Sequence, residues 1–480
     1  MTVLVIDVGT SSIRAVILDD TAHVLVDARR PLLPSTPFPG LVEFDPVELA
    51  AVAIDLAHDV IDRCDQPVDA VGICNQRAST VVWDPADGQP VGPGIGWQDL
   101  RTVGECLSLQ ADGFRLAPNH SATKCAALLD AADPDRARHL LFGTVDSWLV
   151  WNLTHGAAHI TDLSNASVTG LMERDATGWD AAVLDALRIP AAAMPTIVDT
   201  AGLHAAATAL PGAPPIAAIV GDQQASLVGQ GCVSEGRAKI TFGTGGMLDL
   251  WVGDARPGFD LRGDRGTFPL VAARQDGHVK WALEGVMLAA GTNIEWLRDD
   301  LRLIDTAEES HDLASTCDHT DGVVYVPALL GLGTPHWDYG ARGGLFGITR
   351  GTTAAHVVRA VLEGVAHRGA DLVDAAERDS GLTIDAIRVD GGMSANPTFV
   401  HALADTTQRT VELSPEVEAT SRGAALLALV GIGRLALGDV GDMWEPRARI
   451  EPSGSLDRDR WAEAVRRVGG WHGELSALDF

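Results

Sequence analysis

The feature that most constrains this 480-residue chain is a strand–turn–strand pattern that occurs twice. In the first copy, the apolar run Val3–Ile6 leads through Asp7 to the turn Gly9–Ser12, and a second apolar run follows. In the second copy, Lys239–Phe242 leads to the turn Gly243–Gly246. Each turn exposes backbone N–H groups and hydroxyls, which form concave sites for anionic oxygens. Two such turns, one from each half of the chain, predict that the two halves close around one phosphate chain and bind it from both sides.

The length of the chain indicates two domains. The chain is longer than the domains that a single hydrophobic core usually supports. The predicted strands alternate with helices in two similar halves, which is typical of mixed α/β domains with parallel connections. We therefore expect an N-terminal domain over 1–234, a C-terminal domain over 235–450 and a helical tail over 451–480. In the second half, the patterns predict a loop-rich section over 253–280 and an apolar helix over 283–301.

Charge and hydropathy narrow the classes of partner and compartment. The formal net charge is −29, from 36 basic and 65 acidic residues. The electrostatic field of so negative a protein repels nucleic acid and anionic membranes. The sequence contains no apolar run of about 18 residues and no signal-peptide pattern, so we expect a cytoplasmic protein with neither nucleic acid nor membrane as partner. Phosphate groups would have to be bound by local amides, an arginine and a metal ion.

Asp7 and Arg14 flank the first turn. Asp7 stands at the end of the first strand, and a carboxylate beside a phosphate-sized turn is well placed to hold Mg²⁺, usually through water. The plainer interpretation is a solvated turn carboxylate. Arg14, two residues into the next strand, would clamp a transferring phosphoryl group; in isolation it would be interpreted as an exposed strand charge.

Asp222 is the candidate base. It follows the apolar strand Ile216–Val220 directly after Gly221, at the strand end where α/β proteins bind ligands. A carboxylate there would accept the proton of a substrate hydroxyl as its oxygen attacks phosphorus. The alternative role is a helix N-cap, since Gln224–Val228 has a helical pattern, and the two roles are compatible.

Other polar segments also follow strands. Asp390–Asn396 combines glycines, which allow close approach of backbone to a ligand, with the start of a helix, which favours phosphate; the plainer interpretation is a strand-to-helix turn with an Asn cap. Asn75–Arg77 and Trp97–Arg101 offer polar groups and an indole that would line a small polyhydroxyl pocket, although each taken singly is more often structural.

Together these motifs resemble the FGGY family of carbohydrate kinases, and the resemblance covers nearly the whole chain. The segments Gly331–Gly351 and Ala354–Ala366 resemble the C-terminal signature of the family. Within the family, the chain is most similar to the glycerol kinase-like members. The segments that carry this similarity are Ile73–Arg77, Thr80–Asp84, Trp97–Thr102, Ser121–Lys124, Gly221–Gln224 and Gly291–Asp299.

The resemblance implies a duplicated actin-like ATPase (ribonuclease H-like) fold, an α/β fold with two domains around a central cleft. It also implies ATP-dependent phosphorylation of a hydroxyl of a small polyol or sugar, with ATP and Mg²⁺ as cofactors, and it leaves open whether the chain forms a homo-oligomer. By position, Asp222 resembles the catalytic base and Asp7 the magnesium carboxylate. Residues that resemble nucleotide contacts are Thr10, Ser11, Arg14, Thr244, Gly245, Gly291, Gly392 and Asn396. Residues assigned to the substrate pocket are Gln76, Arg77, Trp97, Asn119, Asp222 and Gln223.

The chain departs from the glycerol kinase pattern at the pocket. Ala78 stands where those kinases carry Glu, Asn119 and His120 where they carry Tyr and Phe, and Met247 where they carry Phe. Losing a carboxylate and aromatic walls predicts a larger pocket with different hydrogen bonds, and such changes shift discrimination strongly. A tetritol, pentitol or ketopentose is therefore as credible a substrate as glycerol.

Two alternatives stay open. The first is a ketopentose kinase of the xylulokinase type, against which Gln76–Arg77 stands where those enzymes carry a Met-His pair. The second is a non-catalytic actin-like ATPase or sensor, against which Asp222 and the family signature are retained.

Overall fold

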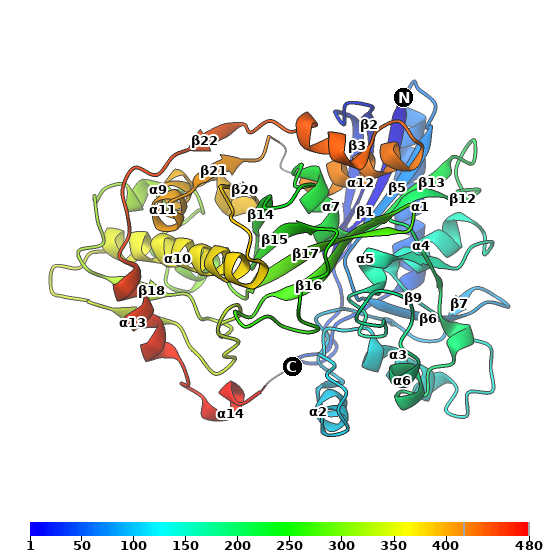
Figure 1. The fold of residues 1–480 in the computed structure, drawn as a ribbon, viewed down its shortest axis with the longest axis horizontal. Coiled ribbons are helices and arrows are strands. Elements are labelled where there is room, and N and C mark those ends of the chain that lie inside the picture. The colour runs from blue at the N-terminus through cyan, green and yellow to red at the C-terminus, as the bar shows by residue number, and fades with distance from the viewer. Residues whose placement is uncertain (416–417, 479–480) are drawn as a thin grey trace.

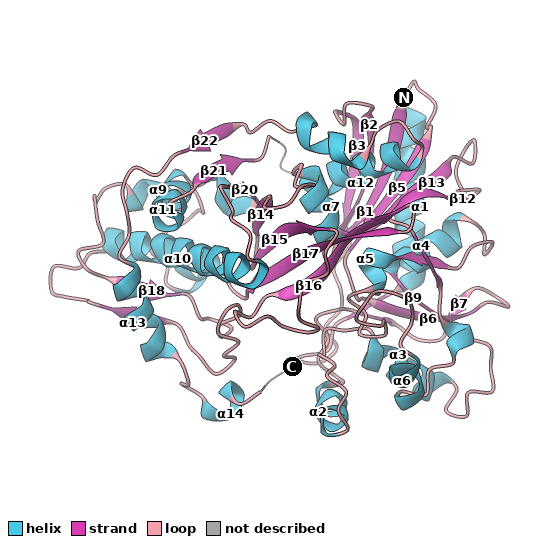
Figure 2. Cartoon of the chain, in the orientation of Figure 1, coloured by secondary structure: helices cyan, strands magenta, loops and turns pink. Residues whose placement is uncertain are grey.

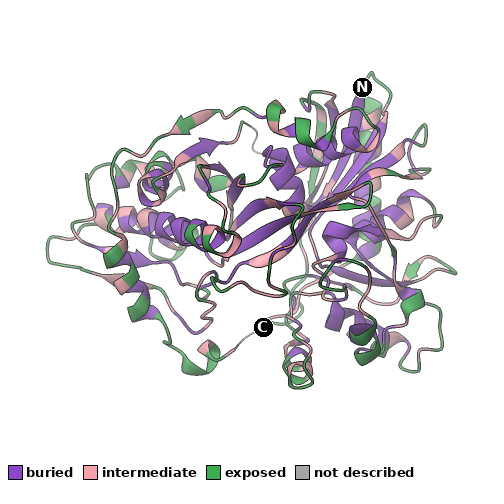
Figure 3. Ribbon diagram, viewed as in Figure 1, coloured by how far each residue is buried: buried purple, intermediate pink, exposed green. Residues whose placement is uncertain are grey.

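The computed structural model describes residues 1–415 and 418–478, which form two halves that each contain one large sheet (Figure 1). Helices cover the faces of these sheets (Figure 2), and buried residues concentrate in the sheets and in the helices packed on them (Figure 3). Within the described residues, no helix is long and apolar enough to cross a membrane.

The sheet of the first half combines an antiparallel meander with parallel strands. Strands β1, β2 and β3 form the meander, while β5 and β13 run parallel to β1. From edge to edge, the sheet contains β12 (Ala201–Ala206), β13 (Pro215–Gly221), β5 (Ala70–Asn75), β1 (Thr2–Val8), β2 (Ser12–Asp19) and β3 (Val24–Pro31).

The sheet of the second half repeats this plan. Strands β14, β15 and β17 are adjacent and antiparallel, and β20 and β21 run parallel to β14 on its other side. From edge to edge, the sheet contains β16 (Phe268–Gln275), β17 (His278–Met287), β15 (Gly246–Gly253), β14 (Ala238–Phe242), β20 (Ala386–Asp390), β21 (Thr410–Leu413) and β22 (Ala448–Ile450). The repeat of the strand–turn–strand pattern in the sequence is therefore a repeat of the sheet core.

The remaining strands form smaller sheets. In the first half they are β4 (Glu43–Phe44), β6 (Thr80–Asp84), β7 (Gln89–Pro90), β8 (Gly94–Ile95), β9 (Leu141–Thr144), β10 (Ile160–Asp162) and β11 (Thr196–Val198). In the second half they are β18 (Val324–Val326) and β19 (Gly344–Phe346).

The longest helix of the first half begins at a side-chain cap. Helix α1 (Pro46–Arg63) begins after Asp45, whose side chain accepts hydrogen bonds from two backbone N–H groups of the first turn, and Pro46 occupies the first helical position. The other helices of this half are α2 (Val103–Ala111), α3 (Ala122–Ala132), α4 (Val145–Leu153), α5 (Leu163–Ala166), α6 (Ala181–Ala186) and α7 (Asp222–Gly229).

The second half differs from prediction over 253–301. The section expected to be loop-rich contains β16 and the start of β17, and the helix expected over 283–301 is the end of β17 followed by α8 (Thr292–Glu295) and a short π-helical turn, Trp296–Asp300. Most of β17 is buried, and a continuously apolar strand cannot be separated from a buried helix by periodicity alone. The other helices are α9 (Glu309–Ala314), α10 (Ala354–Ser380), α11 (Pro397–Thr407), α12 (Ala419–Gly431), α13 (Arg458–Val468) and α14 (Gly473–Ser476).

Helix α12 comes late in the chain but packs on the first sheet, beside α7 (Figure 1). Glycines make this close approach possible, because a Cβ at Gly423 would overlap the carbonyl oxygen of Ala225 and a Cβ at Gly229 would overlap that of Ala419. A Cβ at Gly72 on β5 would lie 2.7 Å from the carbonyl oxygen of Ala424. Helix α7, which begins at Asp222, is thus packed closely against α12, and α12 in turn is packed on the first sheet.

We expect Gly423→Ala to lower the free energy of unfolding by more than about 2 kcal/mol, because the added methyl has to separate two helix backbones. Gly104→Ala in α2 is the matched control: no described atom lies within 4 Å of its Cβ position, so stability should stay the same or rise slightly. Thermal and urea unfolding of both variants measure this. Equal stability of the two variants would contradict the packing described for α7 and α12.

Candidate active site

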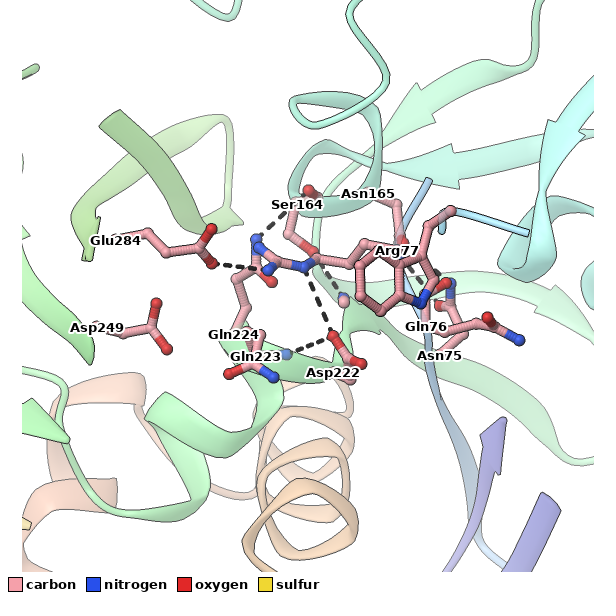
Figure 4. Close-up of polar contacts among 12 residues, drawn as sticks. Asn75, Gln76, Arg77, Ser164, Asn165, Asp222, Gln223, Gln224, Asp249 and Glu284 are labelled. Carbon is pink, nitrogen blue, oxygen red and sulfur yellow. Dashed lines mark hydrogen bonds and ion pairs between the residues drawn. The ribbon is translucent and has the colours of Figure 1, made fainter. Parts of the chain in front are cut away.

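Asp222 begins α7 directly after β13. Its Oδ1 accepts a hydrogen bond of 2.8 Å from the backbone N–H of Gln223 and lies 3.5 Å from Nε of Arg77 (Figure 4). The N–H of Gly221 donates to Ser164 Oγ at 2.9 Å, which fixes the end of β13. Burial raises the pKa of Asp222, while the positive charge of Arg77 acts against this rise.

Arg77 joins the two halves of the molecule. It follows β5 in the first half, and its Nη2 donates a hydrogen bond of 2.7 Å to Oε2 of Glu284 on β17 in the second half. Both side chains are only 12% exposed. A Cβ at Gly221 would lie 2.9 Å from the Cγ and Cδ atoms of Arg77, so the glycine leaves room for the arginine stem across the end of β13. Arg77 therefore lies between the carboxylate of Asp222 in the first half and that of Glu284 in the second.

Polar contacts also tie the first turn to Gln76 and Trp97. Nε2 of Gln76 donates to the carbonyl oxygen of Gly9 at 3.3 Å. The indole Nε1 of Trp97 donates to Thr10 Oγ1 at 3.1 Å. The structure thus brings a predicted nucleotide residue, Thr10, into contact with a predicted substrate residue, Trp97. Ser11 is exposed on the same turn.

Asp7 lies at the base of this turn. Its Oδ2 accepts a hydrogen bond of 3.1 Å from Ser421 Oγ, at the start of α12. Burial raises the pKa of Asp7 to about 6, and the negative charge of Asp222 acts in the same direction. The two predicted carboxylates are therefore close enough to repel each other.

The second turn lies against Gly291. The N–H of Gly291 donates to the carbonyl oxygen of Gly243 at 2.8 Å, and the N–H of Ala290 donates to that of Thr244 at 2.8 Å. A Cβ at Gly291 would lie 2.6 Å from the Gly243 oxygen, and a Cβ at Gly245 would lie 2.8 Å from the oxygen of Met287. Thr244, Gly245 and Gly291 thus form one backbone-lined surface.

The segment after β20 packs on the end of β14. Gly391 has φ +84°, and a Cβ there would overlap the backbone of Phe242. At Gly392, the described residues leave the Cβ position open within 4 Å. Oδ1 of Asn396 accepts from the N–H of Phe399 at 3.1 Å, so Asn396 is the N-cap of α11, and its Nδ2 donates to a serine hydroxyl at 2.8 Å. The predicted cap is present, and Gly392 lies near the second turn.

Arg14 and Asn119 are placed apart from these contacts. Arg14 forms ion pairs with Asp27 at 3.4 Å and with Glu418 at 3.6 Å. Asn119 lies in the turn before α3, and within the described chain no hydrogen bond joins it to the other predicted pocket residues. Its neighbour His120 is half-buried, and desolvation lowers the pKa of its imidazole to about 4.

Sequence reasoning missed several charged residues at this site, chiefly Glu284, Lys239 and Asp249. Glu284 pairs with Arg77, and Lys239 forms a fully buried ion pair of 2.8 Å with Asp249. Charged residues inside apolar strands were the available signal, since a buried charge needs a partner. The partner could not be read from spacing, because it comes from another strand or from the other half.

Comparison with known proteins now decides the family. Residues 2–229 match the N-terminal domain of the FGGY family of carbohydrate kinases, and residues 238–432 match its C-terminal domain. The chain belongs to the FGGY family of carbohydrate kinases. It is 41% identical over 497 aligned residues to a glycerol kinase of Halorhodospira halophila (strain DSM 244 / SL1), and the match covers 98% of this chain and 97% of that kinase.

Solved structures agree with this result. The crystal structure of Plasmodium falciparum glycerol kinase with ADP has a TM-score of 0.90 and 27% sequence identity, covering 100% of this chain and 99% of that one. A ligand-bound xylulose kinase from Lactobacillus acidophilus has a TM-score of 0.85 at 19% identity, covering 99% and 98%, and shares the fold. The predictions of family, actin-like two-domain fold and ATP-dependent kinase are confirmed: the chain is a glycerol kinase-like FGGY carbohydrate kinase.

We expect Asp7→Asn to raise the melting temperature of the ligand-free protein at about pH 7.5. The folded-state pKa of Asp7 is about 6, above its ordinary 3.8, so its stabilising contribution is present in acid and is lost as the pH rises toward 6 and above. Asparagine removes the charge and can still accept from Ser421. Relative to the variant, the wild type should lose stability between about pH 4 and pH 7.

Thermal unfolding of both proteins across this pH range measures the difference. A variant that melts below the wild type at every pH would contradict the assignment of Asp7 as an unfavourably buried charge.

Proposed function

We propose that this chain transfers the γ-phosphoryl group of ATP to a hydroxyl of a small polyol, with Asp222 as the general base. The observation that carries the proposal is the position of Asp222, at a strand end with its Oδ1 3.5 Å from Arg77 Nε. Burial raises the pKa of Asp222 above its ordinary value, which makes its carboxylate a stronger proton acceptor. The curated relatives named glycerol kinases support a polyol as the acceptor.

In this proposal, Arg77, Gln76, Trp97 and Gln223 hold the polyol, and Asp222 accepts the hydroxyl proton as the oxygen attacks phosphorus. Arg77 has N–H groups to donate to substrate oxygens, while its pair with Glu284 fixes the guanidinium plane. The indole of Trp97, which is 38% exposed, offers an apolar surface to the carbons of the polyol.

The nucleotide would lie between the two turns. On the first turn, Thr10 and Ser11 offer hydroxyls and N–H groups. On the second, Thr244, Gly245 and Gly291 offer backbone, and Gly392 allows a close approach. Arg14 would bind phosphate only by exchanging its two carboxylate partners for phosphate oxygens. In our account Asn396 supports this surface through the cap of α11.

We assign the substrate residues to a domain over 1–234, the nucleotide surface mainly to a domain over 235–450, and a supporting role to the tail over 451–480. Helix α12 belongs to the segment 235–450 but packs on the first sheet, where Ser421 contacts Asp7. The nucleotide segment therefore has a direct connection to the carboxylate beside the first turn.

Magnesium fits the carboxylate of Asp7. Burial and the charge of Asp222 raise the pKa of Asp7 to about 6, so a cation there would offset an unfavourable negative charge. Mg²⁺ in nucleotide sites is commonly held by one or two carboxylates together with phosphates and waters; a cluster of three or more acidic, His or Cys ligands, which the described residues lack, is not required. When bound, the ion would neutralise charge on the phosphate oxygens.

Replacing Asp222 by Asn should lower kcat by roughly 10²–10⁴-fold and leave nucleotide affinity nearly unchanged, as expected for loss of a general base. Initial rates in a coupled ATPase assay measure kcat, and titration with a nucleotide analogue measures the affinity. Turnover close to the wild-type value would remove Asp222 from the mechanism.

The acceptor should be longer than glycerol. Ala78 cannot accept a hydrogen bond through its side chain, whereas the exposed Asn119 can both donate and accept. A panel of C3 to C5 polyols and ketoses should therefore give a higher kcat/KM for a C4 or C5 compound. A preference for glycerol by tenfold or more, about 1.4 kcal/mol of transition-state stabilisation, would contradict this pocket argument and leave a plain glycerol kinase.

A further inference from the structure

A row of charged side chains crosses the second sheet. Its members are directly opposite one another on neighbouring strands, so they share one face of the sheet. In order from β22 to β17, this charged row consists of Arg449, Glu412, Arg388, Lys239, Asp249 and Glu284. Apart from Arg449, which is 61% exposed, these side chains are buried.

The charged row faces the first half of the molecule. Arg388 donates to the carbonyl oxygen of Gln230 just after α7. Lys239 Nζ donates to Oε1 of Gln223 at 2.8 Å, and Glu284 accepts from Arg77. Two residues of the proposed polyol pocket, Gln223 and Arg77, are thus held by charges of the other half.

The ammonium of Lys239 has a complete set of partners. Besides Gln223 Oε1, Nζ lies 2.8 Å from Asp249 Oδ2 and 3.0 Å from Thr241 Oγ1. The ammonium is thus held by two hydrogen bonds and one ion pair, which together define its orientation. The side chains of Lys239 and Asp249 are fully buried, so their ion pair is shielded from solvent.

This arrangement determines which end of the Gln223 amide faces the pocket. Because an ammonium can only donate, the Gln223 atom beside Lys239 has to be the carbonyl oxygen. The NH₂ group then lies on the opposite side, and Figure 4 shows it turned toward Asp222 while the amide oxygen is turned toward Asp249. Gln223 therefore offers a donor, not an acceptor, beside the proposed base.

We propose that Lys239 is a positioning residue for the acceptor substrate: it fixes the Gln223 amide so that its NH₂ group donates to a polyol oxygen next to the one whose proton Asp222 accepts. This inference rests on the proposed function and adds to it the role of Lys239 and the direction of the hydrogen bond. The pocket edge then presents an acceptor at Asp222 and donors at Gln223 and Arg77, which suits oxygens on adjacent carbons of the substrate.

The test uses the double variant Lys239→Met/Asp249→Leu. It replaces the buried ion pair by apolar side chains of similar size, a change that is commonly neutral or stabilising, and it removes the contact that orients Gln223. We expect a melting temperature near that of the wild type and a KM for the polyol raised about tenfold, the loss of one hydrogen bond. The KM for ATP should change by less than about twofold, since Lys239 contacts no predicted nucleotide residue.

A second variant tests the direction of the hydrogen bond. In Gln223→Glu, the carboxylate still accepts from Lys239 but has no NH₂ group to donate, so the polyol KM should rise without loss of thermal stability. Lys280→Met is the matched control, because Lys280 also pairs with an aspartate, Asp254, but that pair is partly exposed and lies away from Gln223. This control should keep the wild-type KM.

The outcomes separate the two proposals. If the wild type shows no polyol-dependent ATP consumption across the panel, the proposed function fails. If the wild type is active and either Lys239→Met/Asp249→Leu or Gln223→Glu keeps the wild-type polyol KM, the role of Lys239 is refuted while the function stands. A rise in KM that tracks only a fall in melting temperature would indicate a structural role and would also overturn the proposal.

Discussion

The ion pair between Arg77 and Glu284 is the contact on which the rest of the site depends. It joins the end of a strand in the first sheet to a strand of the second, with 2.7 Å between Nη2 and Oε2 and little exposure of either side chain. A buried ion pair is expensive to desolvate and weak as a source of stability. Its value here is geometric, since it holds the guanidinium beside Asp222 only when the two halves are together.

Other cross-half contacts are both polar and apolar. Lys239 contacts Gln223, and Ser226 Oγ donates to Asp390 Oδ2 at 3.3 Å. Trp251, Leu270 and Ala282 of the second sheet share one buried apolar cluster with residues of the first sheet and α7, and an apolar contact of this kind resists separation of the two halves. The glycine contacts between α12 and α7 lie at Ala225 and Gly229, within two turns of Asp222 on the same helix. The base thus lies on a tightly packed helix, beside the polar contacts between the halves.

The sequence allowed the sheet core and the family to be predicted, because both rest on local patterns. The strand–turn–strand repeat, the Asp45 cap of α1 and the strand-end position of Asp222 all depend on neighbouring residues. The end of strand β17 was wrongly predicted as the start of a helix, since burial on both faces removes the period of two. The charged row was missed because its members come from six strands scattered between residues 238 and 450.

The sequence named candidate residues of the site but not their partners. Thr10 and Trp97 are in contact, and Asp222 lies beside Arg77. The ion pairs of Arg14 with Asp27 and Glu418 have no local signal, because they depend on strand register and on a residue far along the chain. The Asn cap of α11 is different, because it depends only on neighbouring residues of the strand-to-helix turn.

We infer that the acceptor pocket is completed by residues from both halves, so that anything that holds the halves together strengthens polyol binding. Isothermal titration of the best polyol, in the absence and presence of a saturating non-hydrolysable ATP analogue, measures this coupling. We expect a polyol Kd at least about threefold lower with the analogue, and an equal effect of the polyol on the analogue. The same polyol Kd in both titrations would show that the pocket is complete without the second half.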